Sequence, residues 1–308
     1  MLTQEQCVPA PAPVPELELA LALARTVRSA AHSQAMARIH LELPDRLRVR
    51  GRGRVKLHDK AAAHTHGWDE QRARAANARL ALELAELQYQ LFADGRYGVL
   101  VVLQAIDSGG KDSTIRHVFS AFNPQGCSVR AFKVPSAEEL RHDFLWRIHQ
   151  HVPARGEITV FNRSHYEDVL VARVDNLVRT QVWQARYRQI NEFERMLGEN
   201  DIRVVKLFLH ISKAEQRRRL EERIHDPRKQ WKFEPQDMVK RAQWSAYQQA
   251  YGDMLGRCNT RHAPWYVIPS DHKWVRDQAV AQIMYAALRS LALRFPPPRF
   301  DPRRMRVR

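Results

Sequence analysis

A short glycine-rich stretch that carries a lysine is the most chemically informative part of the sequence. The apolar run 99–104 (VLVVLQ) passes directly into AIDSGGKDST, which places Gly110 and Lys111 between a buried strand and a helix that begins near Ser113. In this setting backbone N–H groups and a helix N-terminus point at phosphate oxygens, and the lysine neutralises charge on a moving phosphoryl group. The stretch therefore predicts a phosphate-binding loop.

The match to the pattern G-x-x-x-x-G-K-[ST] is incomplete. Ala105 replaces the first glycine, and Asp112 stands where the metal-binding hydroxyl residue is usual. A plain glycine-rich turn between a strand and a helix remains an alternative on this evidence alone. A second motif is needed to decide.

That second motif follows the apolar run 157–161 (EITVF). Enzymes with a phosphate loop usually carry a metal-binding aspartate at this point, whereas this chain has Asn162. Carboxylates at Glu167 or Asp168, together with Asp107 in the loop, offer the hard oxygen ligands that suit Mg²⁺. Arg163 is expected to point into the same cleft, at the edge where parallel strands end.

Five apolar runs separated by amphipathic helical stretches must position these groups. This alternation predicts an α/β protein with a parallel sheet covered by helices on both faces. A helix is expected over 69–92, because Leu80, Leu84, Leu87 and Leu91 recur at helical spacing. The expected strands are 99–104, 128–132, 157–161, 202–211 and 264–269.

The chain divides into one large domain and two appendages. Residues 1–44 are rich in Ala, Pro and Leu and form an N-terminal appendage, and 294–308 form a basic tail rich in Pro and Arg. The intervening domain, 45–293, contains a polar, basic, helical stretch at about 212–250 that is too long for a simple crossover. We interpret that stretch as a lid.

Composition limits the compartment and the partners. Fifty Lys and Arg against 34 Asp and Glu give a net charge of +16, which favours a polyanionic partner. Three scattered cysteines fit neither a disulfide framework nor a zinc site. No apolar run reaches the roughly 18 residues that a membrane span needs. The sequence therefore predicts a soluble, cytoplasmic protein without a membrane partner.

The motifs also resemble a known family. The stretches 104–174, 210–233 and 263–274 are similar to the polyphosphate kinase 2 family, and the similarity extends over about residues 55–290. The resemblance implies a three-layer P-loop kinase fold with a helical lid. It also implies Mg²⁺, with Mn²⁺ as an alternative, and reversible phosphoryl transfer between inorganic polyphosphate and nucleoside mono- or diphosphates.

Individual residues can be carried over from this resemblance. Asp107 and Lys111 fall on the family's loop aspartate and lysine, Arg163 falls on the arginine after the second-motif strand, and Asp168 completes the implied metal site. Asn162 departs from members that have aspartate there. The sequence FNRSHYEDVL nevertheless resembles the subgroup that uses both AMP and ADP.

A polyphosphate chain needs a cationic track rather than an apolar pocket. Three lid arginines, Arg218, Arg219 and Arg223, are expected to close over the transferring phosphates, although a solvated helix face is an equal alternative for each. The groups expected to contact phosphate are Gly109, Gly110, Lys111, Asp112, Ser113, Arg116 and Lys133.

Two other functions compete with this one. The first is an ATP-dependent kinase of a nucleotide or small metabolite, which only a test of the phosphoryl donor separates. The second is a non-enzymatic nucleic-acid-binding protein, but Asp107 and Asp168 would repel a phosphate backbone in the absence of a metal. The expected partners are polyphosphate, AMP, ADP and ATP, with guanine nucleotides as further candidates, and the resemblance implies a homo-oligomer.

Overall fold

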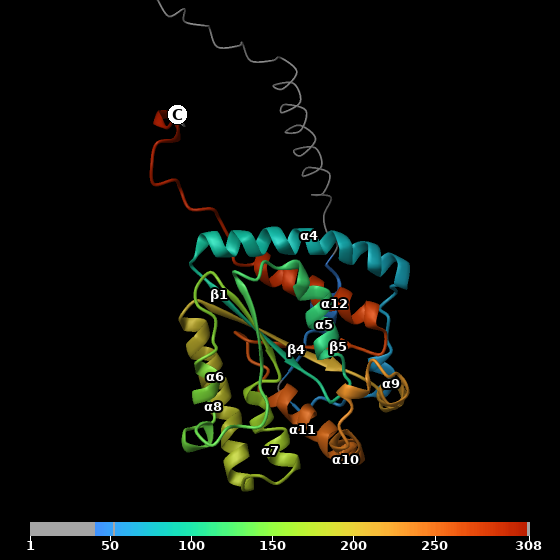
Figure 1. Ribbon diagram of the computed structural model, residues 1–308. Helices are drawn as coiled ribbons and strands as arrows, with labels where there is room; N and C mark the ends of the chain where they lie inside the picture. The colour runs from blue at the N-terminus through green and yellow to red at the C-terminus, as the bar shows by residue number, and fades with distance from the viewer. Residues whose placement is uncertain (1–40, 52, 307–308) are drawn as a thin grey trace, which may run out of the picture. The chain divides into compact units, whose positions relative to one another are not determined.

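The computed structural model describes residues 41–51 and 53–306, and its central feature is a five-stranded sheet (Figure 1). All strand pairs are parallel, in the order β2-β3-β1-β4-β5. The strands are β1 (Gly98–Gln104), β2 (Cys127–Ala131), β3 (Ile158–Asn162), β4 (Ile202–His210) and β5 (Trp265–Pro269). The predicted α/β class and the five predicted strands are confirmed.

The register of the central strands brings the two sequence motifs together. Every residue of β1 is buried, as expected for a strand with neighbours on both sides and helices on both faces. Leu103 of β1 lies opposite Asn162 of β3. Because parallel strands end at the same edge of a sheet, the loop after β1 and the polar residues after β3 face one another.

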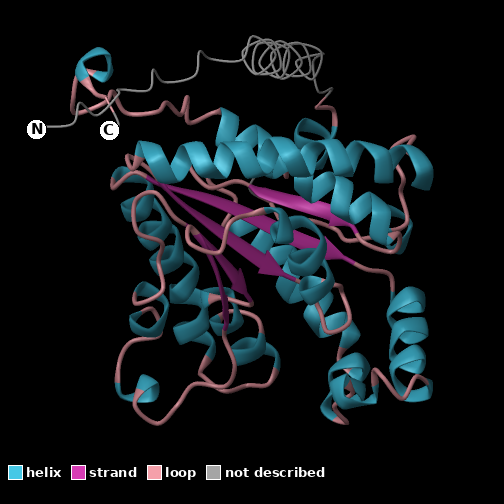
Figure 2. Cartoon of the chain, turned by 45° about the horizontal axis from the view of Figure 1, so that its top comes forward, coloured by secondary structure: helices cyan, strands magenta, loops and turns pink. Residues whose placement is uncertain are grey.

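Helices form a layer on each face of the sheet (Figures 1 and 2). On one face α5 and α12 lie against the strands and α4 packs on α12, while α6, α7, α8 and α11 cover the other. The α-helices are α2 (Leu43–Leu47), α3 (Asp59–Ala62), α4 (Glu70–Asp94), α5 (Lys111–Val118), α6 (Trp146–His149), α7 (Val171–Val174), α8 (Thr180–Glu199), α9 (Lys213–His225), α10 (Gln236–Ala242), α11 (Trp244–Arg257) and α12 (Lys273–Arg289). Short 3₁₀ helices are η1 (Phe119–Ala121), η2 (Glu139–Arg141), η3 (His165–Asp168), η4 (Gln230–Lys232) and η5 (Pro302–Arg304).

The long helix α4 follows from local signals. Asp69 caps its start by accepting a hydrogen bond from the backbone N–H of Arg72 at 2.8 Å. Gly95 ends it in the left-handed conformation, with φ of 65°. The four leucines at helical spacing are all buried, which confirms the predicted helix: Leu80, Leu84, Leu87 and Leu91.

The segment that the sequence analysis treated as a lid has two different parts. Helices α9 and α10 are polar and partly exposed, whereas Trp244, Tyr247 and Tyr251 of α11 are buried in the core. Residues 244–250 therefore belong to the core layer. Only 213–243 keeps the polar, partly exposed character on which the prediction of a lid rests.

A segment near each end of the described chain is hydrogen-bonded to its body. The backbone N–H of Val49 donates to the carbonyl of Trp265, the first residue of β5, at 2.9 Å. At the other end the backbone N–H of Arg294 donates to Asp94 at 2.8 Å. Most of the predicted appendage 1–44 lies outside the described residues. None of the helices in the described part of the chain is long and apolar enough to cross a membrane.

Candidate active site

The loop between β1 and α5 has the tight geometry of a phosphate loop. Ser108 and Gly110 have φ of 66° and 105°, and Gly110 caps the start of α5. A Cβ placed on Gly109 would lie 2.6 Å from the Cβ of Ala105 and 2.9 Å from the carbonyl oxygen of Ile106. The side chain of Ala105 and the carbonyl of Ile106 therefore leave no space for a side chain at 109.

Lys111 is folded back across this loop. Its side chain is buried, and its Nζ donates to the carbonyl oxygen of Ala105 at 2.9 Å. Burial, with added repulsion from Arg163, lowers the pKa of Lys111, and Asp107 partly offsets these effects. The lysine is thus a desolvated cation held at the loop, as charge neutralisation on a phosphoryl group requires.

Asp107 lies among cationic side chains from three parts of the chain: Lys111, Arg163 and Lys240. Its Oδ1 accepts from Nη2 of Arg163 at 2.7 Å, and its Oδ2 lies 3.3 Å from Nζ of Lys240, on α10. Burial raises the pKa of Asp107, but the charges of Lys111, Arg163 and Lys240 outweigh burial and lower it. We call Asp107, Lys111, Arg163 and Lys240 the Asp107 cluster. A narrow cavity beside it is lined by Ala105, Ile106, Asp107, Arg163, Glu167, Val171, Lys240, Tyr247 and Tyr251.

The backbone holds Arg163 in a strained conformation. Its φ of 64° is rare for a residue with a side chain, and such strain costs on the order of 1–3 kcal/mol. Two neighbouring contacts stabilise it: the N–H of Arg163 donates to the carbonyl of Leu103 at 3.2 Å, and Nδ2 of Asn162 donates to Asp112 at 2.7 Å. Residues held in such strained backbone conformations are found preferentially at functional sites.

The two neighbouring carboxylates on η3 have different surroundings. Glu167 lines the narrow cavity with Asp107. Asp168 does not line it, and its Oδ1 pairs with Nη1 of Arg186 at 3.0 Å. Burial raises the pKa of Asp168 to about 6, with a smaller contribution from Glu167. Glu167, rather than Asp168, is therefore the carboxylate that faces the loop.

The three lid arginines do not face the narrow cavity. Arg218 is 57% exposed and pairs with Glu215 at 2.6 Å. Arg219 is buried and donates to the carbonyls of Ser108, at 3.1 Å, of Asp271, at 3.1 Å, and of Ser270. It thus ties the phosphate loop to the start of α12.

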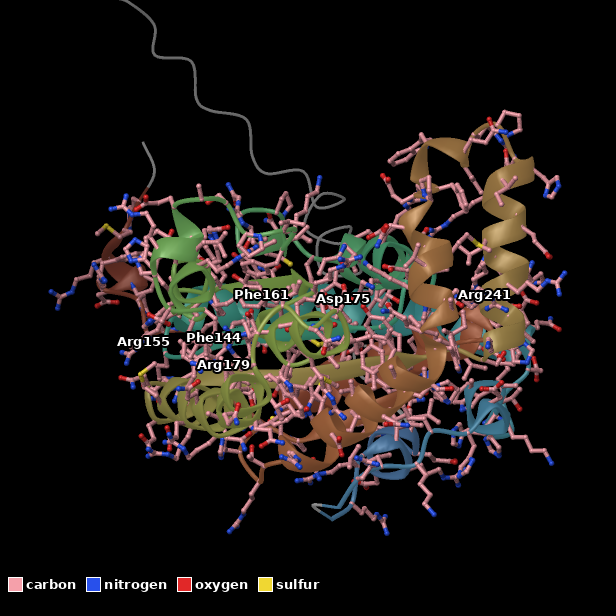
Figure 3. The ribbon with its side chains drawn as sticks, turned by 90° about the horizontal axis from the view of Figure 1, so that it is seen from below. Phe144, Arg155, Phe161, Asp175, Arg179 and Arg241 are labelled. Carbon is pink, nitrogen blue, oxygen red and sulfur yellow. The ribbon has the colours of Figure 1, made fainter. Side chains whose placement is uncertain are left out.

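Arg223 links the two lid helices, because its Nη1 lies 3.3 Å from Oδ2 of Asp237. Arg241, labelled in Figure 3, makes a second link. Its Nη1 donates to the carbonyl oxygen of Lys213 and to Oε1 of Gln216, both on α9 and both at 2.8 Å. These contacts hold α9 and α10 together, and Lys240 of α10 points to the carboxylate of Asp107.

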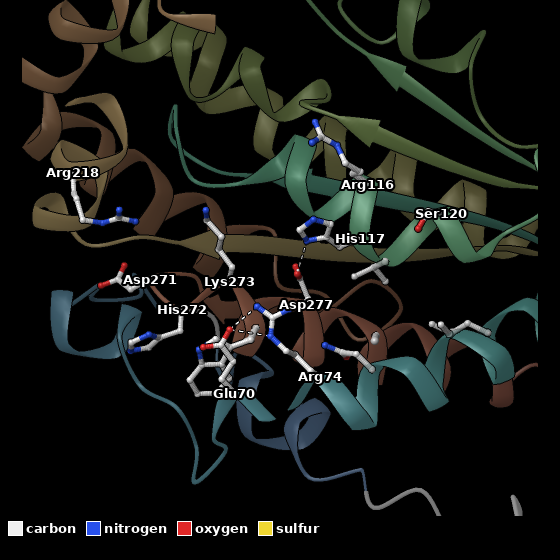
Figure 4. A pocket seen from close by; sticks show the side chains of 16 residues that line it. Glu70, Arg74, Arg116, His117, Ser120, Arg218, Asp271, His272, Lys273 and Asp277 are labelled. Carbon is white, nitrogen blue, oxygen red and sulfur yellow. Dashed lines mark hydrogen bonds and ion pairs between the residues drawn. The ribbon is translucent and has the colours of Figure 1, made fainter. Parts of the chain in front are cut away.

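The remaining expected phosphate contacts are not part of the Asp107 cluster. Lys133 is exposed after β2 and lines neither cavity described here. Arg116 lies, with Arg218 and Lys273, on a separate cavity of about 690 Å³ between α4, α5, α9 and the start of α12 (Figure 4). This second cavity adjoins the helix that follows the phosphate loop.

Two site residues escaped sequence reasoning. Lys240 lies in the ordinary polar helix α10, and Arg276 is fully buried in α12, where its Nη2 donates to Ser113 at 3.0 Å. Neither belongs to a local motif. Only the contacts of α10 and α12 with the loop identify them.

Residues that could hold a metal are few. The described part of the chain contains no group of three or more His, Cys, Asp or Glu residues that could hold an ion by themselves. Asp107 and Glu167 share one cavity. This pair fits Mg²⁺, which commonly takes one or two protein carboxylates and completes its coordination with substrate phosphates and water.

A parallel sheet of this order, with a glycine-lysine loop after its central strand and cations gathered at that loop, defines a P-loop phosphotransferase. The family model described as Polyphosphate kinase 2 matches residues 67–295. The chain belongs to the polyphosphate kinase 2 family, which confirms the resemblance seen in the sequence.

Individual relatives agree with this assignment. The chain is 52% identical to the AMP/ADP-polyphosphate phosphotransferase of Meiothermus ruber, over 74% of this chain and 86% of the relative. It is 44% identical to the ADP-polyphosphate phosphotransferase of Rhodopseudomonas palustris, over 69% and 78%. The crystal structure of polyphosphate kinase 2 from Arthrobacter aurescens TC1 is 40% identical, with a TM-score of 0.82 and coverage of 86% of this chain and 95% of that one.

Proposed function

We propose that this protein transfers phosphoryl groups reversibly between inorganic polyphosphate and AMP or ADP. The observation that carries the proposal is the Asp107 cluster, in which three cations converge on the phosphate loop. Family membership supports polyphosphate as the phosphoryl donor. The names of the relatives from M. ruber and R. palustris support AMP and ADP as acceptors.

The reaction exchanges one P–O bond for another. An oxygen of the acceptor's terminal phosphate attacks the end phosphorus of polyphosphate. As the new P–O bond forms, the bond to the bridging oxygen breaks and the chain leaves one phosphate shorter. The transition state spreads negative charge over the transferred group. We assign Lys111, Arg163 and Lys240 to neutralise this charge.

Asp107 has a positioning role in this scheme. Three cations this close repel one another, and the carboxylate between Arg163 and Lys240 holds them in place. Its lowered pKa keeps it ionised at neutral pH. No covalent enzyme intermediate is needed, because alignment and charge neutralisation are sufficient for phosphoryl transfer.

We propose Mg²⁺ as the metal, with Mn²⁺ as a substitute. Asp107 would be one ligand, and Glu167 takes the second place that the sequence analysis gave to Asp168, because Asp168 is paired with Arg186. Held by these two carboxylates, such an ion would supply positive charge that stabilises the charge on the transferring phosphate. Closure of 213–243 over the site, with Lys240 meeting Asp107, would exclude water.

The test is formation of ADP or ATP from AMP or ADP with polyphosphate and Mg²⁺. We expect turnover by the intact protein, loss of it in Lys111→Met, and retention in Lys60→Met, whose lysine is exposed on α3. Activity with ATP and a small acceptor but none with polyphosphate would reinstate the ATP-dependent kinase. Use of guanine nucleotides, homo-oligomer formation and a cytoplasmic location stay predictions.

A further inference from the structure

The buried side chain of Arg276 has no role in the scheme above. It is fully buried on α12. Its Nε and Nη2 donate to Oδ1 of Asp277 at 2.9 and 2.6 Å, and Nη2 also donates to Oγ of Ser113 at 3.0 Å. Its Nη1 has no hydrogen-bond partner among the described residues. Buried polar groups are nearly always paired, so an unpaired guanidinium N–H needs an explanation.

Arg276 and Asp277 contact one side of α5, the helix that follows the phosphate loop. Arg276 holds Ser113, and Oδ2 of Asp277 lies 2.9 Å from Nδ1 of His117. Ser113 and His117 are four residues apart on α5 and therefore share a helix face. Figure 4 shows the contact between His117 and Asp277 on the wall of the second cavity. Through these two contacts α12 holds both ends of α5, and the contact with Ser113 lies at the end next to the phosphate loop.

The unpaired Nη1 lies directly beneath the loop. A Cβ added to Gly110 would collide with it, so the arginine closes the space beside this glycine. Nη1 of Arg219 lies 3.5 Å from the same position and donates to the carbonyl of Ser108. Two guanidinium groups thus support the loop from the side of the protein core, where the low dielectric strengthens their field.

We propose that Arg276 is a positioning residue of the phosphate loop. It fixes the Gly110–Ser113 turn in the conformation that receives the phosphate chain and places an N–H donor without a protein partner, Nη1, beside it. The proposal rests on the proposed function, because it assumes that this loop receives the end of polyphosphate. It predicts that the loss of Arg276 weakens phosphate binding through Ser113.

The test measures the binding of tripolyphosphate by calorimetry, alongside thermal unfolding. Arg276→Met should weaken binding about tenfold to a hundredfold, the range for a lost hydrogen bond to a charged group, and Arg276→Lys should restore part of it. Ser113→Ala should also weaken binding. The double variant should bind no worse than Arg276→Met, because the two residues act as one unit. The control Arg289→Met removes an exposed arginine from the end of the same helix.

Unchanged binding in a folded Arg276→Met, or independent additive losses in the double variant, would overturn the proposal. If Arg276→Met does not fold, Arg276→Lys and Ser113→Ala supply the comparison. A wild type that binds tripolyphosphate but transfers no phosphate to AMP or ADP contradicts the proposed function and not the role of Arg276. The two failures are therefore distinguishable.

Discussion

A buried ion pair behind the active site allows a quantitative prediction. Lys206 of β4 and Glu194 of α8 are both fully buried. Nζ of Lys206 donates to Glu194 at 2.6 Å, to the hydroxyl of Tyr166 at 2.9 Å and to the carbonyl of Cys258 at 2.6 Å. All three N–H bonds of the ammonium group are thus used. Tyr166 belongs to η3, which also carries Glu167, so the pair supports one wall of the site.

Lys206→Met should lower the free energy of unfolding by about 3–5 kcal/mol near neutral pH, because it leaves the Glu194 carboxylate buried without a cation. This is a large part of the roughly 5–15 kcal/mol that stabilises a typical domain. Adding Glu194→Gln removes the unpaired charge and should recover part of the loss. Urea unfolding of both variants and the wild type gives the values.

The pH dependence gives an independent check. In the wild type burial raises the pKa of Glu194, but the charge of Lys206 and the hydrogen bond with His165 outweigh burial and lower it. Its contribution to stability is therefore present above the pKa of the unfolded chain and is lost as pH falls through the folded-state value. Without Lys206 burial dominates and the pKa rises, so the deficit of Lys206→Met should shrink towards about pH 5. A deficit independent of pH, or a double variant less stable than Lys206→Met, would refute the reasoning.

Three further predictions concern other parts of the site. Asn162→Asp should reduce turnover, because it places a second carboxylate beside that of Asp112. Adding Asp112→Asn should restore turnover, since the 2.7 Å hydrogen bond between the two side chains can then form in the opposite direction. A rate assay of the single and double variants tests this, and a double variant as slow as Asn162→Asp would contradict it. Arg219→Ala should lower the free energy of unfolding by about 2–4 kcal/mol, because the carbonyls of Ser108, Ser270 and Asp271 lose their donor. Arg218→Ala should change the free energy of unfolding by less than about 0.5 kcal/mol, and equal losses in the two variants would contradict this prediction. The pKa of Asp168, raised to about 6, makes its contribution to stability fully present below the unfolded value and lost as pH rises through about 6, so Asp168→Asn should flatten the stability profile between about pH 4 and 7, and an unchanged profile would exclude this role.

The sequence by itself determined the fold and the position of the loop. Buried parallel strands appear as short continuous apolar runs, and a glycine-lysine turn between strand and helix is a local signal, so the five strands and Lys111 could be located without coordinates. Helix α4 was predictable for the same reason, since its leucine spacing and its end signals, Asp69 and Gly95, are all local. The resemblance to the polyphosphate kinase 2 family rested on these same motifs.

The tertiary structure decided which charged groups meet at the loop. Glu167 and Asp168 are neighbours in the sequence, and only the geometry of η3 directs one to the cavity beside Asp107 and the other to Arg186. Lys240 and Arg276 come from helices far along the chain and carry no motif. A periodic pattern records which face of an element is buried, but not which partner covers it, because charge pairing depends on contacts between residues distant in the sequence.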